Sequence, residues 1–173
     1  ELNGGIPVFI KLKFPDYHID WDEVKRMITR KTRLIIINSP HNPTGTVLKK
    51  EDLDALAHLV ANSNILVLSD EVYEHITFDG LPHVSAASHP ILAERSFVVF
   101  SFGKTFHATG WKLGYVLAPE NLMKEFRKIH QYDVFSCNAP IQRAMADFME
   151  YDEVFHIKDM YQQKRDFFLE QIK

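Results

Sequence analysis

The sequence predicts an α/β fold, with a mostly parallel sheet flanked by helices. Three observations predict it. First, apolar runs of strand length recur at residues 34–37, 65–68 and 97–100. Second, segments with the apolar periodicity of helices, at about 20–28 and 50–61, precede or separate these runs. Third, each run ends in polar turn residues, and runs without polar alternation are typical of parallel strands covered on both faces.

Further elements follow from local signals along the chain. Residues 8–12 are mainly apolar and follow a Gly/Pro-containing segment, which predicts a short strand. Asp20, with Glu23 three residues later, predicts a capped helix start. Residues 113–117 predict a further strand after the three buried runs. Beyond residue 119 the alternation ends and only helical patterns remain, so we expect the chain to leave the sheet there.

Composition narrows the classes of function. Lys and Arg number 20, Asp and Glu number 23, and both signs are mixed, so neither nucleic acid nor a membrane is an expected partner. No apolar run reaches the ~18–20 residues of a membrane span, and no signal peptide is visible. The single Cys137 cannot form an internal disulfide, which fits a cytoplasmic location. The histidines show no metal-ligand spacing, so we expect no metal site.

Polar side chains follow each of the three buried runs. The first run leads to Asn42 on a Pro-rich turn, the second ends at Asp70 with Tyr73 close behind, and the third ends at Ser101 with Lys104 close behind. Each residue alone is more often a helix cap, a turn residue or a solvated lysine. Because ligands bind outside the carboxyl ends of strands in open α/β sheets, the convergence of all five indicates a ligand site.

This set of side chains suits pyridoxal phosphate. The Lys104 amine can form a Schiff base with its aldehyde. The Asp70 carboxylate can keep its ring nitrogen protonated by favouring the charged form. Asn42 and Tyr73 can donate hydrogen bonds to its phenolic oxygen. Its phosphate needs hydroxyls and cations, a role open to Ser101 and Lys112.

Four motifs carry a resemblance to a known family. They are Asn-Pro-Thr-Gly at 42–45, Asp-Glu-Val-Tyr at 70–73, Ser-Phe-Gly-Lys-Thr-Phe at 101–106 and Gly-Trp-Lys-Leu-Gly at 110–114. In order and spacing the motifs resemble the fold-type-I, class I/II aminotransferases. Within that family the chain is most similar to the kynurenine and methionine aminotransferases, through residues 101–114 and 130–132. The resemblance covers essentially the whole chain.

The resemblance implies a role for each matching residue. Lys104 would hold pyridoxal phosphate as a Schiff base and move the proton of the substrate α-carbon. Asp70 and Tyr73 would complete the catalytic set. The cofactor-binding set would be Asn42, Asp70, Tyr73, Ser101, Lys104 and Lys112. Many relatives have Arg in place of Lys112. The peptide bond before Pro43 would be cis.

The resemblance also implies partners. The parent protein would be a homodimer whose substrates are an amino acid and a 2-oxo acid. In relatives that act on dicarboxylates, an Arg near residues 131–140 binds the second carboxylate. Residues 131–135 contain no Arg, and Asp133 would repel that group. We therefore expect a neutral or aromatic amino donor, such as methionine.

Family members extend beyond this chain at both ends. We expect residues 1–119 to be the core of the cofactor-binding large domain, truncated at its N-terminal side, and residues 120–173 to be helices leading to a missing small domain. On this interpretation the chain is a fragment that is inactive alone. Two alternatives stay open: a carbon–sulfur β-lyase on the same cofactor, and a non-catalytic aminotransferase-like effector domain of a transcription regulator.

Overall fold

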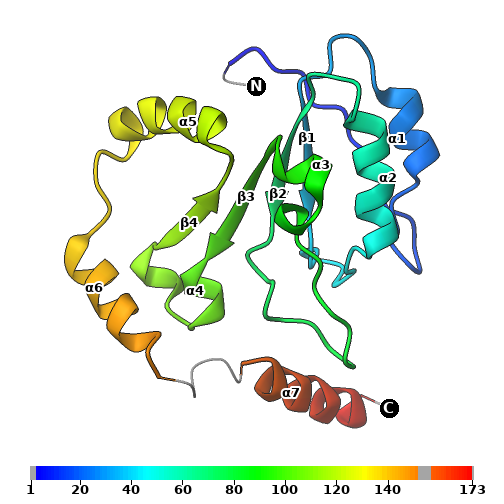
Figure 1. The fold of residues 1–173 in the computed structure, drawn as a ribbon. Helices are drawn as coiled ribbons and strands as arrows, with labels where there is room; N and C mark the ends of the chain where they lie inside the picture. Colours follow the sequence, from blue (N-terminus) through cyan, green and yellow to red (C-terminus); the bar gives the residue numbers. More distant parts are fainter. Residues whose placement is uncertain (1–2, 152–156, 173) are drawn as a thin grey trace.

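The computed structural model describes residues 3–151 and 157–172, and it confirms the α/β class. Its sheet has four strands in the order β1-β2-β3-β4 (Figure 1). The first three strands are parallel and β4 is antiparallel to β3. The strands are β1 (Leu34–Asn38), β2 (Leu66–Asp70), β3 (Ser96–Ser101) and β4 (Gly114–Leu117). The predicted strands at 34–37, 65–68, 97–100 and 113–117 therefore lie within two residues of the observed bounds.

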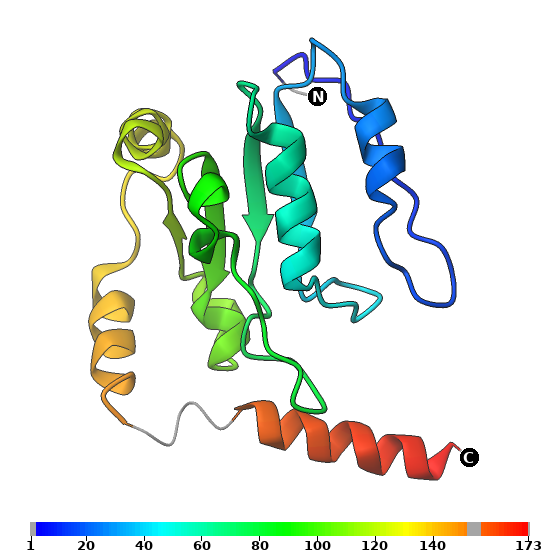
Figure 2. The same ribbon diagram turned by 45° about the vertical axis from the view of Figure 1, so that its right-hand side comes forward.

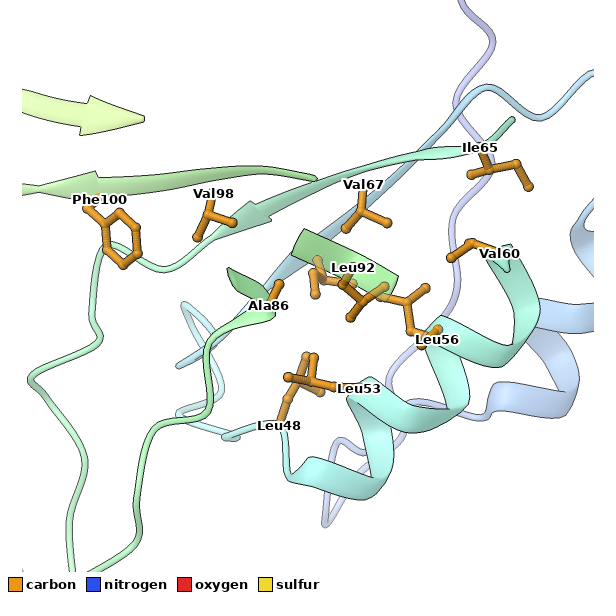
Figure 3. Close-up of a cluster of buried hydrophobic side chains, with 12 residues drawn as sticks. Leu48, Leu53, Leu56, Val60, Ile65, Val67, Ala86, Leu92, Val98 and Phe100 are labelled. Carbon is orange, nitrogen blue, oxygen red and sulfur yellow. The ribbon is translucent and has the colours of Figure 1, made fainter. Parts of the chain in front are cut away.

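The core lies between the sheet and helix α2 (Lys50–Val60), which covers one face of it (Figure 2). Leu53, Leu56 and Val60 of α2 point toward Val67 and Val98 of the sheet (Figure 3). The short helices η1 (Ala86–Ser88) and α3 (Pro90–Ala93) close the same cluster. Each fully buried aliphatic side chain contributes about 1.5–3 kcal/mol, so this face anchors the strands whose ends form the site.

Helix α1 (Trp21–Met27) begins as the sequence predicted. The Oδ1 atom of Asp20 accepts a hydrogen bond from the Glu23 backbone N–H at 2.9 Å, which satisfies a free N–H of the first turn. The Trp21 indole N–H donates to the Asp52 carboxylate at 2.9 Å. This bond fastens α1 to α2, and Trp21 also packs against the core cluster.

The remaining helices lie outside the core. They are α4 (Phe102–Thr105), η2 (Thr109–Trp111), α5 (Glu120–Asp133), α6 (Ala139–Phe148) and α7 (Ile157–Gln171). Helices α5 and α6 lie on the β4 side of the sheet, whereas α7 crosses near the carboxyl ends of the strands (Figures 1 and 2). Across the described segments, we find no helix with the length and apolar character needed to traverse a bilayer.

Two expectations about the sheet are wrong. Residues 8–12 form no strand, and the side chains of Val8 and Phe9 are 59% and 79% exposed. A strand needs a neighbouring backbone to bond with, and no described strand lies beside this segment. The run 34–37 is a strand, but it is covered on one face only, because Ile36 is 66% exposed. Among the described residues no helix covers Ile36 as α2 covers Ile37.

Candidate active site

Parallel pairing brings the predicted site residues to one edge of the sheet. In the register of the strands, Asn38 is the partner of Asp70 and Asp70 is the partner of Val99. The carboxyl ends of β1, β2 and β3 therefore lie side by side. Asn42 follows β1. Asp70 ends β2 and Tyr73 follows it, and Ser101 ends β3 with Lys104 three residues later. The sixth predicted residue, Lys112, lies two residues before β4.

Three of the side chains meet directly. The Asn42 Nδ2 donates to the Tyr73 hydroxyl oxygen at 3.3 Å, across 31 residues of sequence. The Lys104 ammonium nitrogen lies 5.5 Å from the centre of the Tyr73 ring, within the range of a cation–π contact. The bond between Asn42 and Pro43 is cis, as the family resemblance implied. The amide of Asn42 and the amine of Lys104 thus both lie next to the phenol of Tyr73 at this edge of the sheet.

Asp70 occupies the last position of β2 and is half-buried. Its backbone carbonyl oxygen accepts bonds from the Ser39 N–H at 3.0 Å and from the Asn38 Nδ2 at 2.9 Å. Its Oδ1 accepts only a long bond of 3.3 Å, from the Val72 N–H. The backbone of Asp70 is therefore held firmly while its carboxylate retains capacity for a further partner.

Asn38 is a site residue that the sequence reasoning missed. Its Nδ2 donates to the Asp70 carbonyl, and its Oδ1 accepts from the Asn42 backbone N–H at 2.9 Å. A single amide thus ties the end of β2 to the turn that carries Asn42. The available signal was an amide at the end of an otherwise apolar run, since such a residue has a donor and an acceptor to satisfy.

The two residues predicted for the phosphate lie on adjacent chain segments. Ser101 is the N-cap residue of α4, yet its hydroxyl makes no capping bond. In the antiparallel register Ser101 is the partner of Gly114, so the chain passes Lys112 two residues before it returns to Ser101. Lys112 is exposed and has the left-handed backbone conformation, with φ +53°. The pairing of β3 with β4 therefore places the segments that carry Ser101 and Lys112 side by side.

Two glutamates, Glu71 and Glu74, lie in the segment that follows β2. Glu71 is 1% exposed. Its burial favours a raised pKa, but hydrogen bonds from His83, Ala86, Ser85 and Ser69 outweigh burial and hold the pKa of its carboxyl below the ordinary value. Burial raises the pKa of Glu74 to about 7, with the charge on His83 opposing the shift and the charge on Glu71 adding to it. The His75 Nε2 lies 3.5 Å from the Glu74 carboxylate. The region next to Tyr73 thus holds one ionised carboxylate and one that titrates near neutrality.

The comparison with known proteins now identifies the family. Residues 1–173 match the family Aminotransferase class I and II, and the chain belongs to it. It is 47% identical to the methionine aminotransferase of Escherichia coli K12 over 95% of this chain and 43% of that protein. It is 37% identical to mouse kynurenine–oxoglutarate transaminase 1, over 88% of this chain and 38% of that protein.

A solved structure extends the likeness to three dimensions. The crystal structure of an Escherichia coli protein with methionine aminotransferase function superposes with a TM-score of 0.87 at 47% identity. The superposition covers 90% of this chain and 42% of that one. The predicted likeness to methionine and kynurenine aminotransferases is therefore confirmed. The chain spans less than half the length of these relatives.

Proposed function

We propose that this chain supplies the cofactor-holding core of a pyridoxal-phosphate-dependent aminotransferase. The observation that carries the proposal is the meeting of Asn42, Tyr73 and Lys104 beside Asp70 at one sheet edge, with the two contacts of 3.3 and 5.5 Å described above. Membership of the aminotransferase family supports transamination as the reaction class.

The chemistry of these residues fits the cofactor. A primary amine, a carboxylate, an amide and a phenol are the groups needed for its aldehyde, its ring nitrogen and its phenolic oxygen. Asp70 keeps a carboxylate oxygen available, as required to pair with a ring nitrogen. The Ser101 hydroxyl is not used to cap α4, so it is available to a phosphate. We assign the phosphate to Ser101 and Lys112.

Bound pyridoxal phosphate supplies an electron sink for the substrate α-carbon. The chain's own residues then orient the reactants and move one proton. The Lys104 Nζ would take the proton from the α-carbon as a general base and, as a general acid, deliver it to the cofactor carbon that carried the aldehyde. Asp70 favours the protonated ring nitrogen by its negative charge. Asn42 and Tyr73 would donate hydrogen bonds to the phenolic oxygen of the cofactor.

We propose a neutral or aromatic amino donor and a 2-oxo acid acceptor. Residues 131–135 carry no Arg that could pair with a second carboxylate, and the negative Asp133 opposes one. In the intact homodimeric protein, residues 1–119 would belong to the large domain and residues 120–173 would lead to a small domain. A cytoplasmic location stays a prediction.

Donor competition in the full-length protein tests this function. We expect faster turnover with methionine or phenylalanine than with aspartate, with 2-oxoglutarate as the acceptor. The Lys104→Arg variant keeps the charge but cannot attach the cofactor, so we expect its activity to fall at least about a hundredfold. The matched control is Lys50→Arg, because Lys50 is exposed and pairs with Asp54 at 2.6 Å within α2. Aspartate as the best donor contradicts the proposed substrate, and an active Lys104→Arg variant contradicts the proposed site.

A further inference from the structure

The Glu71 carboxylate is held by three directed hydrogen bonds inside the protein. The Ser69 hydroxyl donates to Oε1 at 2.8 Å, and the Ala86 backbone N–H donates to the same oxygen at 2.9 Å. The His83 Nε2 lies 2.8 Å from Oε2. Only 1% of the Glu71 side chain is exposed, so its charge depends on these donors and not on water.

This carboxylate lies on the opposite side of the chain from the candidate site. Burial alternates along β2, so Val67 and Ser69 face the core while Asp70 faces away from it. Glu71 continues the alternation, and its side chain returns to the core side. Anchoring Glu71 therefore restricts the backbone that aims the Asp70 carboxylate in the other direction.

The same carboxylate closes the loop that carries Tyr73. From Glu71 to Ser85 no residue belongs to a helix or a strand, so the backbone of this segment lacks a ladder of its own. His83 and Ala86 lie 12 and 15 residues after Glu71, and both bonds run across the base of the loop. The loop is thereby pinned at its two ends, and Tyr73 projects from it toward Asn42.

The geometry also fixes the proton on His83. An ionised carboxylate can only accept, so the Nε2 atom must carry the hydrogen of the 2.8 Å bond. The Nδ1 atom of His83 is buried and makes no hydrogen bond to the protein. Among the described residues, the imidazole therefore has one hydrogen-bond partner, the Glu71 carboxylate.

We propose that Glu71 and His83 form a positioning pair for the cofactor. The pair rests on the proposed function, and it acts through Asp70: it holds the end of β2 so that the Asp70 carboxylate meets the cofactor ring nitrogen. The pair touches neither cofactor nor substrate. Its loss weakens cofactor binding without removing any group that contacts the cofactor.

The test measures the Kd of pyridoxal phosphate for full-length variants, by absorbance titration of the apoprotein. His83→Leu removes the donor while Glu71 stays in place, and we expect Kd to rise about tenfold, the size expected for one hydrogen bond to a charged group. His83→Gln restores a side-chain N–H donor, and we expect a Kd within about threefold of the wild type. In an Asp70→Asn background, His83→Leu should change Kd by less than about twofold, because the pair acts through Asp70.

A second carboxylate–histidine contact provides the matched control. The Nε2 of His89 lies 3.3 Å from the Asp54 carboxylate on α2, and neither residue adjoins the site. Asp54→Asn should leave the Kd unchanged. An unchanged Kd in His83→Leu, or an equal effect of His83→Leu with and without Asp70, overturns the positioning role and assigns the pair to stability alone. Absence of any cofactor binding at Lys104 in the wild type overturns the proposed function itself and this inference with it.

Discussion

At Gly114 the backbone of β4 lies very close to the backbone of β3, next to the candidate site. A Cβ atom built on Gly114 would lie 2.5 Å from the carbonyl oxygen of Phe100, which no side chain can tolerate without a shift of the backbone. Gly114 is also the partner of Ser101 in the β3–β4 register. A shift at Gly114 would therefore move the end of β3, where Ser101 and Lys104 lie.

Substitution of Gly114 is expected to be costly. We expect Gly114→Ala to lower the free energy of unfolding by at least about 1–3 kcal/mol, the range for an overpacked site. The matched control is Gly110→Ala, since a Cβ at Gly110 meets nothing within 4 Å, and we expect a change of less than about 1 kcal/mol. Urea denaturation of the full-length variants measures both. Equal stability of the two variants would show that β4 can move away from β3.

Some residues of the site could be predicted from the sequence, and others could not. Asn42, Asp70, Tyr73 and Lys104 follow from the rule that ligands gather at strand ends, and the structure places them at one edge. Partners such as Asn38 escaped prediction, because its bond to the Asp70 carbonyl spans 32 residues. Such a bond depends on the register of two strands, and a one-residue change of register would remove it.

At the scale of elements, helix α2 carries the stability of the sheet. Leu53, Leu56 and Val60 are all at most 2% exposed and share one stripe of the helix. The stripe faces β2 and β3 (Figure 3), so the helix holds the two strands that end in Asp70 and Ser101. Periodicity in the sequence predicted this helix to within one residue, because a helical stripe needs only local spacing.

Truncation in this stripe is expected to unfold the domain more readily. We expect Leu56→Ala to lower the free energy of unfolding by about 2–5 kcal/mol, since Leu56 is 0% exposed and its loss leaves a cavity. The control is Leu169→Ala in α7, where the side chain is 45% exposed, and a change of less than about 1 kcal/mol is expected. Thermal unfolding followed by circular dichroism compares them. A small loss at Leu56 would mean that α2 does not anchor the sheet.

Element prediction failed where a partner was needed. Residues 8–12 have strand-like composition but no neighbouring strand in the described chain, so they remain irregular. Composition reports what a side chain prefers, whereas a strand also needs backbone bonds from another segment. The antiparallel direction of β4 likewise depends on the path through η2 and Lys112, which no periodicity encodes.

At the scale of the whole molecule, one face of the sheet remains open. Leu34 and Ile36 of β1, which alternate with the core-facing Ile35 and Ile37, are 44% and 66% exposed. The core cluster lies on the α2 side, away from these residues. The chain spans 43% of its Escherichia coli relative.

Reductive labelling of the full-length protein tests the central claim most directly. Pyridoxal phosphate is added, the bound form is trapped with borohydride, and peptide mass spectrometry locates the modified lysine. The convergence of Lys104 with Asn42, Tyr73 and Asp70 predicts label at Lys104 and little at the other lysines, because this amine lies beside the groups assigned to the ring of the cofactor. Label spread over surface lysines, with Lys104 unmodified, would contradict the assignment of this sheet edge as the active site.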